Sequence, residues 1–207
     1  MVSETKAAAR RRKLRDALVD AAERTIDAEG LRGLKARELA YKVGCAVGAI
    51  YNVVTDLDDL IYAVNARTLA QLEATLATAG ATAAIAGGAT EATERLIKLA
   101  HAYLDFAIAH APRWRAVFDH QPLTTRGMPD WYLADQMRLF SYVEEPLKVL
   151  QPATATAERA LIARSLVSAV HGIVTLGLEE KLQTLPLPVL REQLALLTRA
   201  MARGLAS

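Results

Sequence analysis

The chain has 207 residues, of which 52% are hydrophobic and only 5% aromatic, and its formal net charge is +2. This length suits one or two domains with a substantial core. Alanine and leucine are abundant, and no alternating apolar run lies between hairpin turns, so the sequence favours helix over sheet and predicts an all-α fold. The single cysteine, Cys45, excludes an internal disulfide and is typical of a reducing cytosol.

Apolar residues at helical spacing predict a succession of helices. The expected helices cover residues 9–29, 56–79, 90–111, 112–120, 130–150 and 156–181, with a last helix ending near 204. Residues 80–89 are rich in alanine, glycine and threonine and are expected to form a linker. Residues 121–129 contain two prolines and are expected to form a loop.

The positive charge is concentrated near the N-terminus. Residues 1–55 contain 11 Lys or Arg against 7 Asp or Glu, whereas the remainder contains 14 against 16. A solvated tail or an arm along a DNA backbone would both have this composition. No apolar stretch follows the basic segment, so it does not resemble a signal peptide. Residues 165–178 are too few to cross a bilayer and suit a buried helix better.

Residues 36–54 have the pattern of two short helices joined at Gly44. Leu39, Ala40 and Val43 form one apolar stripe, and Ile50 and Val54 form another. A left-handed backbone at Gly44 would allow a tight reversal between the helices. The outer face of the second helix carries small or uncharged groups, as expected of a helix that enters the major groove of DNA: Val47, Gly48, Ala49, Tyr51 and Asn52.

The segment from about Arg10 to Val64 resembles the DNA-binding domain of the TetR family of transcriptional regulators. The matching motifs are Arg-Glu-Leu-Ala at 37–40, the glycine turn at 44, Gly-Ala-Ile-Tyr at 48–51 and Asp-Asp-Leu at 58–60. The chain departs from the family pattern where a capping residue, a histidine and a lysine are usual. These places hold Lys35-Ala36, Val53 and Leu57.

The resemblance implies a DNA-binding domain over residues 1–55, followed by a helical ligand-binding and dimerisation domain over residues 56–207. It also implies that the basic arm, residues 6–15, and the two short helices contact double-stranded DNA. These expected DNA contacts are Arg11, Arg12, Arg37, Val47, Gly48, Ala49, Tyr51 and Asn52.

The last two predicted helices favour a homodimer. The segment 161–178 is apolar on nearly every side, and a second copy of the helix pair would cover it. The alternative is that these helices only cover their own core. The expected interface residues are Val167, Val170, Val174, Leu190, Leu194, Leu197 and Met201.

A second, weaker resemblance lies in the same region. Residues 168–176 contain a His-Gly pair at 171–172, and residues 109–118 contain a His-Ala-Pro segment with a nearby tryptophan. Both are similar to signatures of a C-terminal domain found in one TetR branch, known for its Trp-His-Gly motif. This likeness implies one regulator architecture over most of the chain and does not identify a ligand.

Large side chains gather in the middle of the chain, where they would form either ordinary core or the wall of an apolar cavity. The expected ligand contacts are His101, Tyr103, Trp114, Phe118, Met128, Trp131, Phe140 and His171. Such a cavity would suit a small, mostly apolar effector. The helix over 56–79 would transmit its binding to the DNA-binding domain.

The pattern favours a cytoplasmic, ligand-responsive repressor that binds a palindromic operator as a homodimer and has no membrane segment. The four histidines show no metal-ligand spacing, and no nucleotide fingerprint occurs, so no enzyme, metal or cofactor is expected. Two alternatives remain: a protein-interaction or sensor module that has lost DNA binding, and, less favoured, an enzyme built on a helical bundle.

Overall fold

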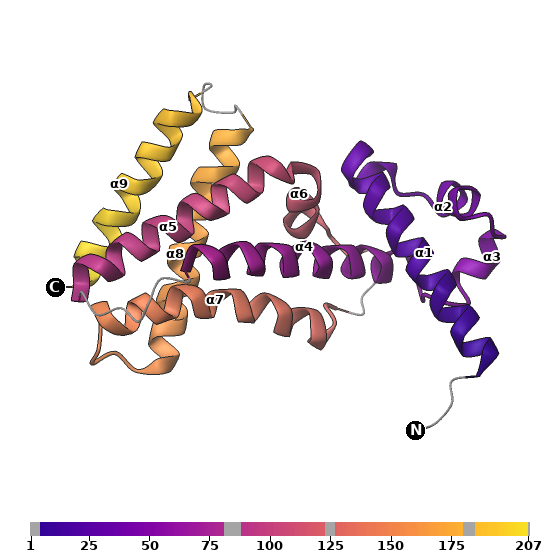
Figure 1. Ribbon diagram of the computed structural model, residues 1–207, viewed down its shortest axis with the longest axis horizontal. Helices are drawn as coiled ribbons and strands as arrows, with labels where there is room; N and C mark the ends of the chain where they lie inside the picture. Colours follow the sequence, from indigo (N-terminus) through magenta and orange to yellow (C-terminus); the bar gives the residue numbers. More distant parts are fainter. Residues whose placement is uncertain (1–4, 81–87, 123–126, 180–184, 207) are drawn as a thin grey trace. The chain divides into compact units, whose positions relative to one another are not determined.

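The computed structural model describes residues 5–80, 88–122, 127–179 and 185–206. All regular elements in these ranges are helical, as the composition predicts (Figure 1). Most of the expected linker at 80–89, the middle of the loop at 121–129 and the expected end of the helix near 181 lie outside the described residues. The described residues form two compact units.

Unit 1 comprises residues 1–70 and 110–132. It contains α1 (Lys6–Glu29), the 3-10 helix η1 (Leu31–Gly33), α2 (Ala36–Val43), α3 (Val47–Ile50), the first half of α4 (Leu57–Gly80) and α6 (Ala111–Asp119). Thr5 caps α1, because its hydroxyl oxygen accepts a hydrogen bond from the Ala8 N–H at 3.3 Å. The helix therefore begins three residues before the expected start.

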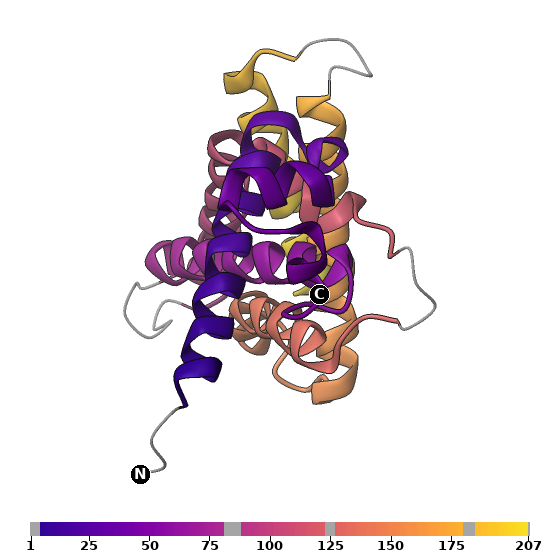
Figure 2. The same ribbon diagram turned by 90° about the vertical axis from the view of Figure 1, so that its right-hand side faces the viewer.

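The core of unit 1 lies between α1, α2, α3 and the start of α4. Leu18, Ile26, Leu39, Ile50 and Leu60 are fully buried there. The α2 helix packs on α1, and α3 follows on α2; Figure 2 views this unit from the side of the short helices. The long α1 helix thus supports the two short ones, neither of which could be stable alone.

Unit 2 comprises residues 71–109 and 133–207. It contains the end of α4, α5 (Gly88–Ala109), most of α7 (Asp130–Leu150), α8 (Thr156–Leu178) and α9 (Leu187–Leu205). Pro146 lies inside α7. The α5 helix packs along α9, and α8 packs beside both (Figure 1).

The two units do not divide the chain at residue 55. The first turns of α4 share a hydrophobic core with α1 to α3 through Leu60, Ile61 and Val64. The α6 helix, although distant in sequence, adds Ala116 to the same core. The assignment of a separate ligand-binding role to the region after residue 55 stays a prediction.

Candidate DNA-reading surface and helical pairing surface

The turn between α2 and α3 has the geometry of a helix-turn-helix. Gly44 adopts the left-handed region, with φ 75° and ψ 39°. Its N–H donates to the carbonyl oxygen of Tyr41 at 3.2 Å, and the Cys45 N–H donates to Ala40 at 2.9 Å. These bonds close α2 and redirect the chain into α3. The role predicted for Gly44 is therefore confirmed.

The α3 helix presents its outer face to solvent. Ile50 is buried in the core, whereas Val47 and Tyr51 are 39% and 51% exposed. Gly48 and Asn52 are exposed, and Ala49 is half-buried. A Cβ built on Gly48 would meet no atom within 4 Å, so nothing within the chain requires a glycine there. A surface free of side-chain bulk suits close approach of another molecule.

The start of α1 lies beside this face. A hollow of about 670 Å³ is lined by Ala7, Arg10, Arg11, Leu14, Ala49, Tyr51, Asn52 and Val53. The fold therefore brings two arginines of the basic arm next to the outer residues of α3. Arg12 and Arg37 are exposed outside this hollow.

Neither short helix has a side-chain cap. Lys35 precedes α2 and Ala46 precedes α3, and neither makes a capping hydrogen bond. The missing cap of α2 agrees with the departure from the family pattern at Lys35-Ala36. The first backbone N–H groups of α2 and α3 therefore donate no hydrogen bond to the side chain of the capping residue.

Two hydrogen bonds from backbone N–H groups to aspartate side chains fix the start of α4. The Asp59 N–H donates to Asp56 Oδ1 at 3.0 Å, and the Thr55 N–H donates to Asp59 Oδ2 at 2.7 Å. This arrangement resembles a capping box, with acids at the positive end of the helix dipole. It fixes where α4 begins in the short segment that follows α3.

Two arginines hold α1 against α4 and α6 within unit 1. Arg67 of α4 donates to Asp20 and Glu23, each at 2.7 Å. Hydrogen bonding to Asp20 raises the pKa of Arg67, and Glu23 adds to this against the opposing effect of desolvation. Arg113 of α6 donates to Glu23 at 2.6 Å and to Asp27 at 2.7 Å. Sequence reasoning missed these contacts, because no local spacing links residues more than 40 positions apart.

The expected ligand contacts fall into both units. In unit 1, Trp114 is buried and packs edge-on against the half-exposed Phe118, with ring centroids 5.7 Å apart. Met128 and Trp131 are exposed by 46% and 48%. Trp131 also lines a cavity of about 340 Å³.

In unit 2, Tyr103 and His171 meet, with 2.8 Å between Tyr103 Oη and His171 Nδ1. His171 Nε2 lies 3.2 Å from the Thr175 hydroxyl. His101 Nε2 lies 3.1 Å from the carbonyl oxygen of Arg191. Phe140 lies beneath the Arg164 guanidinium at 6.0 Å. The contacts of Tyr103 and His101 join α5 to α8 and α9, and the contact of Phe140 joins α7 to α8. The ligand role of the residues stays a prediction.

Three residues assigned to the dimer interface lie inside unit 2. Val174 and Leu194 have no exposed surface, and Leu190 is only 2% exposed. Leu190 packs against Gly177, where an added Cβ would lie 2.6 Å from Leu190 Cδ1. These three side chains are already covered within one copy of the chain, and their assignment to a dimer interface stays a prediction. The regular spacing in α9 marks the stripe that packs within the chain. Val167, Val170, Leu197 and Met201 are half-buried.

A different stripe of α8 faces outward. It begins and ends with Leu161 and Leu176, which are 61% and 42% exposed. Among the described residues, α8 is the one helix that is both long enough and apolar enough to cross a membrane, judged by length and composition alone. Only 11% of its most apolar stretch is buried. The expectation of a buried helix therefore does not hold within one copy of the chain.

The exposed outer face of α3, the arginines of α1 beside it and the helices of unit 2 are the features expected of a helix-turn-helix regulator. The family model described as "Tetracyclin repressor-like, C-terminal domain" matches residues 96–204, which is more than half of the chain. The chain belongs to the TetR family of transcriptional regulators. Proteins of this family are transcription factors and not enzymes. The likeness to the branch with the Trp-His-Gly motif stays a prediction.

Solved structures resemble the whole chain. A protein of unknown function from Rhodococcus sp. RHA1 has a TM-score of 0.71 and 25% identity, over 94% of this chain and 96% of its own. A TetR-like transcriptional regulator from the same organism has a TM-score of 0.59 and 19% identity, over 99% and 100%. PfmR, a TetR family regulator from Thermus thermophilus, has a TM-score of 0.56 and 15% identity, over 90% and 97%. The comparison with curated proteins gave no match.

Proposed function

We propose that the protein is a cytoplasmic, ligand-responsive repressor that binds a palindromic operator as a homodimer. A small, mostly apolar effector releases it from DNA. The observation that carries the proposal is the solvent-facing side of α3 next to arginines of α1. A regulator needs both features, because base edges give sequence specificity and phosphate contacts give affinity.

The reading role rests on small and uncharged groups on α3. Val47, Gly48 and Ala49 would let the helix approach the base edges closely, and Tyr51 and Asn52 would supply hydrogen bonds. Arg37, exposed on α2, would contact the phosphate backbone. Arg11 and Arg12 of the arm would neutralise further phosphates. These contacts would replace those that the usual histidine and lysine make in related proteins.

The dimer role rests on the outward stripe of α8. Leu161, Ser165, Ser168, Gly172 and Leu176 are spaced by four, three, four and four residues, so they share one helix face. Leucines at both ends and small residues between them would allow another helix to pack closely. A second copy of the chain would bury this face about a two-fold axis. Two reading helices would then reach successive half-sites of a palindrome.

The effector role rests on linkage between binding sites. An effector that binds the DNA-free arrangement more tightly than the DNA-bound one lowers the affinity for DNA. The factor is the ratio of the effector's affinities for the two arrangements. The α4 helix is the suitable lever, because its first turns belong to the reading unit and its last turns belong to unit 2. Its capped start, directly after α3, would pass a displacement on to the reading helix.

A fluorescence-anisotropy titration with the DNA upstream of the protein's own gene tests the DNA role. The parent is expected to bind with a steep salt dependence, and Arg37→Ala and Tyr51→Ala are each expected to weaken binding at least tenfold. Arg24→Ala, an exposed arginine on the later part of α1, is the matched control. Equal affinity of parent and both variants would reject the reading surface. Absence of binding would favour the protein-interaction alternative.

A further inference from the structure

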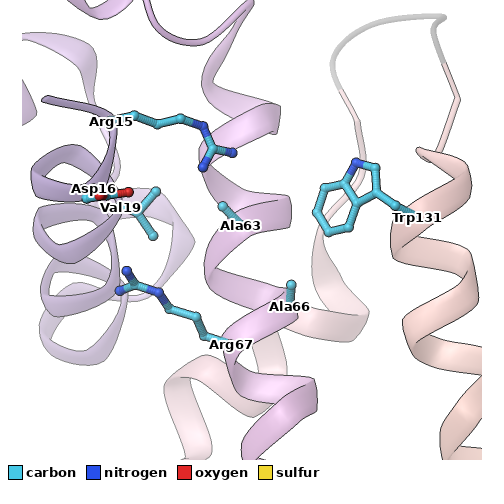
Figure 3. Close-up of a pocket in the computed structure, with 7 residues that line it drawn as sticks. All are labelled: Arg15, Asp16, Val19, Ala63, Ala66, Arg67 and Trp131. Carbon is cyan, nitrogen blue, oxygen red and sulfur yellow. The ribbon is translucent and has the colours of Figure 1, made fainter. Parts of the chain in front are cut away.

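We infer that a cavity on unit 1, bounded by α1, α4 and Trp131, binds a small aromatic monocarboxylic acid. Its use as an effector site rests on the regulatory function proposed above, whereas binding of the acid does not. The cavity measures about 340 Å³ and is lined by Arg15, Asp16, Val19, Ala63, Ala66, Arg67 and Trp131 (Figure 3). This volume is at the lower end of the range for small-molecule sites and suits a compound of one or two rings.

The apolar side of the cavity is a slot between small residues and an indole ring. Ala63 and Ala66 are one turn apart on α4, and Val19 of α1 is buried beside them. Trp131 is 48% exposed, and in Figure 3 its indole extends toward α4. A planar ring in this slot would cover exposed indole surface without displacing any larger side chain.

The charged side of the cavity offers one available cation. The Arg67 guanidinium is engaged by Asp20 and Glu23, each at 2.7 Å, so its charge is already balanced. Arg15 is exposed, and its side chain makes no ion pair or hydrogen bond with the described part of the chain. Figure 3 shows Arg15 extending from α1 in the direction of α4. A guanidinium in this state can hold a carboxylate through two parallel hydrogen bonds.

Asp16 limits the acid to a single carboxylate. It also lines the cavity, and in Figure 3 it lies beside Val19 on α1. Side chains at adjacent positions of a helix do not face each other, so Asp16 leaves the Arg15 guanidinium accessible. Its negative charge would still repel a second carboxylate. The combination of one cation, one nearby anion and an apolar slot therefore selects a monocarboxylic aromatic acid.

Occupancy of the cavity would act on the basic arm. Leu14 precedes Arg15 and lines the hollow that contains Arg10, Arg11, Tyr51 and Asn52. An acid between α1 and α4 would change the placement of the first turns of α1 against α3. Binding of the acid would then change the affinity for DNA, and binding of DNA would change the affinity for the acid by the same factor.

Isothermal titration calorimetry of the full chain without DNA tests the site, with 1-naphthoate and its neutral analogue 1-naphthamide as probes. The acid is expected to bind about tenfold more tightly than the amide. Arg15→Gln should abolish this difference, and Asp16→Asn should increase it. Ala66→Leu should weaken both compounds by filling the slot. Arg24→Gln makes the same change of charge on α1 outside the cavity and should keep the parent's preference.

A fluorescence measurement identifies the place of binding. In a Trp114→Phe background the only tryptophan is Trp131, so titration with 4-nitrobenzoate should quench its emission and Arg15→Gln should weaken the effect. Equal affinities for acid and amide, an unchanged acid affinity in Arg15→Gln, or no saturable binding below about 1 mM would each overturn the inference. Because these titrations contain no DNA, their failure and a failure of operator binding are separate results.

Discussion

Asp58 and His120 meet inside unit 1, with 3.4 Å between Asp58 Oδ1 and His120 Nε2. Their side chains are only 5% and 7% exposed. The pair joins the first turn of α4 to the residue that follows α6. The Tyr62 ring packs edge-on against the imidazole, with centroids 5.3 Å apart, and Tyr132 packs against Tyr62 at 5.0 Å. One buried cluster thus connects α4, the end of α6 and the start of α7.

This cluster predicts a pH dependence of stability. Burial lowers the pKa of His120 below its ordinary value of 6.5, although Asp58 and then Asp56 oppose the shift. The unfolded chain therefore takes up a proton near pH 6.5 that the folded chain does not yet bind. The free energy of unfolding should fall as the pH decreases from about 7.5 through this value. Urea unfolding at several pH values measures it.

His120→Gln isolates the contribution of this histidine, because the other three histidines of the chain are kept in the variant. The difference in unfolding free energy between parent and variant should favour the parent most above pH 6.5 and shrink as the pH decreases. A difference that grows toward lower pH would mean that His120 is stabilised in its charged form by Asp58. The described mechanism would then be wrong.

Close packing of α8 on α9 predicts a large cost for one methyl group. A Cβ at Gly177 would lie 2.6 Å from Leu190 Cδ1 and 2.8 Å from Cδ2, and Leu190 is itself buried. Gly177→Ala should therefore destabilise the chain by about 1–3 kcal/mol in thermal or urea unfolding. Gly204→Ala, where an added Cβ meets nothing within 4 Å, is the control and should not be destabilising. A stabilised Gly177→Ala would contradict this packing.

The sequence was sufficient for the helices and for the reading motif, since both depend on local spacing. Leu39, Ala40 and Ile50 are buried as their pattern predicts, and Gly44 has the expected backbone. The α1 start was missed because Thr5 caps the helix before its apolar stripe begins.

Contacts between residues that are far apart in the sequence cannot be predicted from the local spacing of residue types. Arg113 meets Glu23 and Asp27, about ninety positions away, and nothing in their neighbourhoods distinguishes them from other surface charges. The partner of the regularly spaced leucines of α9 cannot be predicted from the sequence either. A stripe at helical spacing shows that a face is covered, and it does not show whether the cover comes from the same chain or from another copy.

The outward stripe of α8 predicts which changes separate the dimer. Leu161→Glu combined with Leu176→Glu should give a monomer in light scattering, because each places a charge on a face that a second copy would cover. Both leucines are exposed within one chain, so the helical circular dichroism should be kept. Lys98→Glu, exposed on α5, changes the net charge by the same amount and should leave the mass unchanged. A dimer that persists in the double variant would place the interface elsewhere.

Gly48 predicts a separation of stability from DNA binding. Its position in α3 leaves space for a side chain within the chain, and glycine in a helix costs about 0.5–1 kcal/mol relative to alanine. Gly48→Ala should therefore keep or slightly raise the free energy of unfolding. Gly48→Leu should keep the fold and weaken DNA binding at least tenfold, since its side chain would hold α3 away from the base edges. Ala157→Leu, exposed on α8, is the control for added apolar bulk. If Gly48→Leu binds the upstream DNA as tightly as the parent in anisotropy titrations, α3 does not approach the groove through this face.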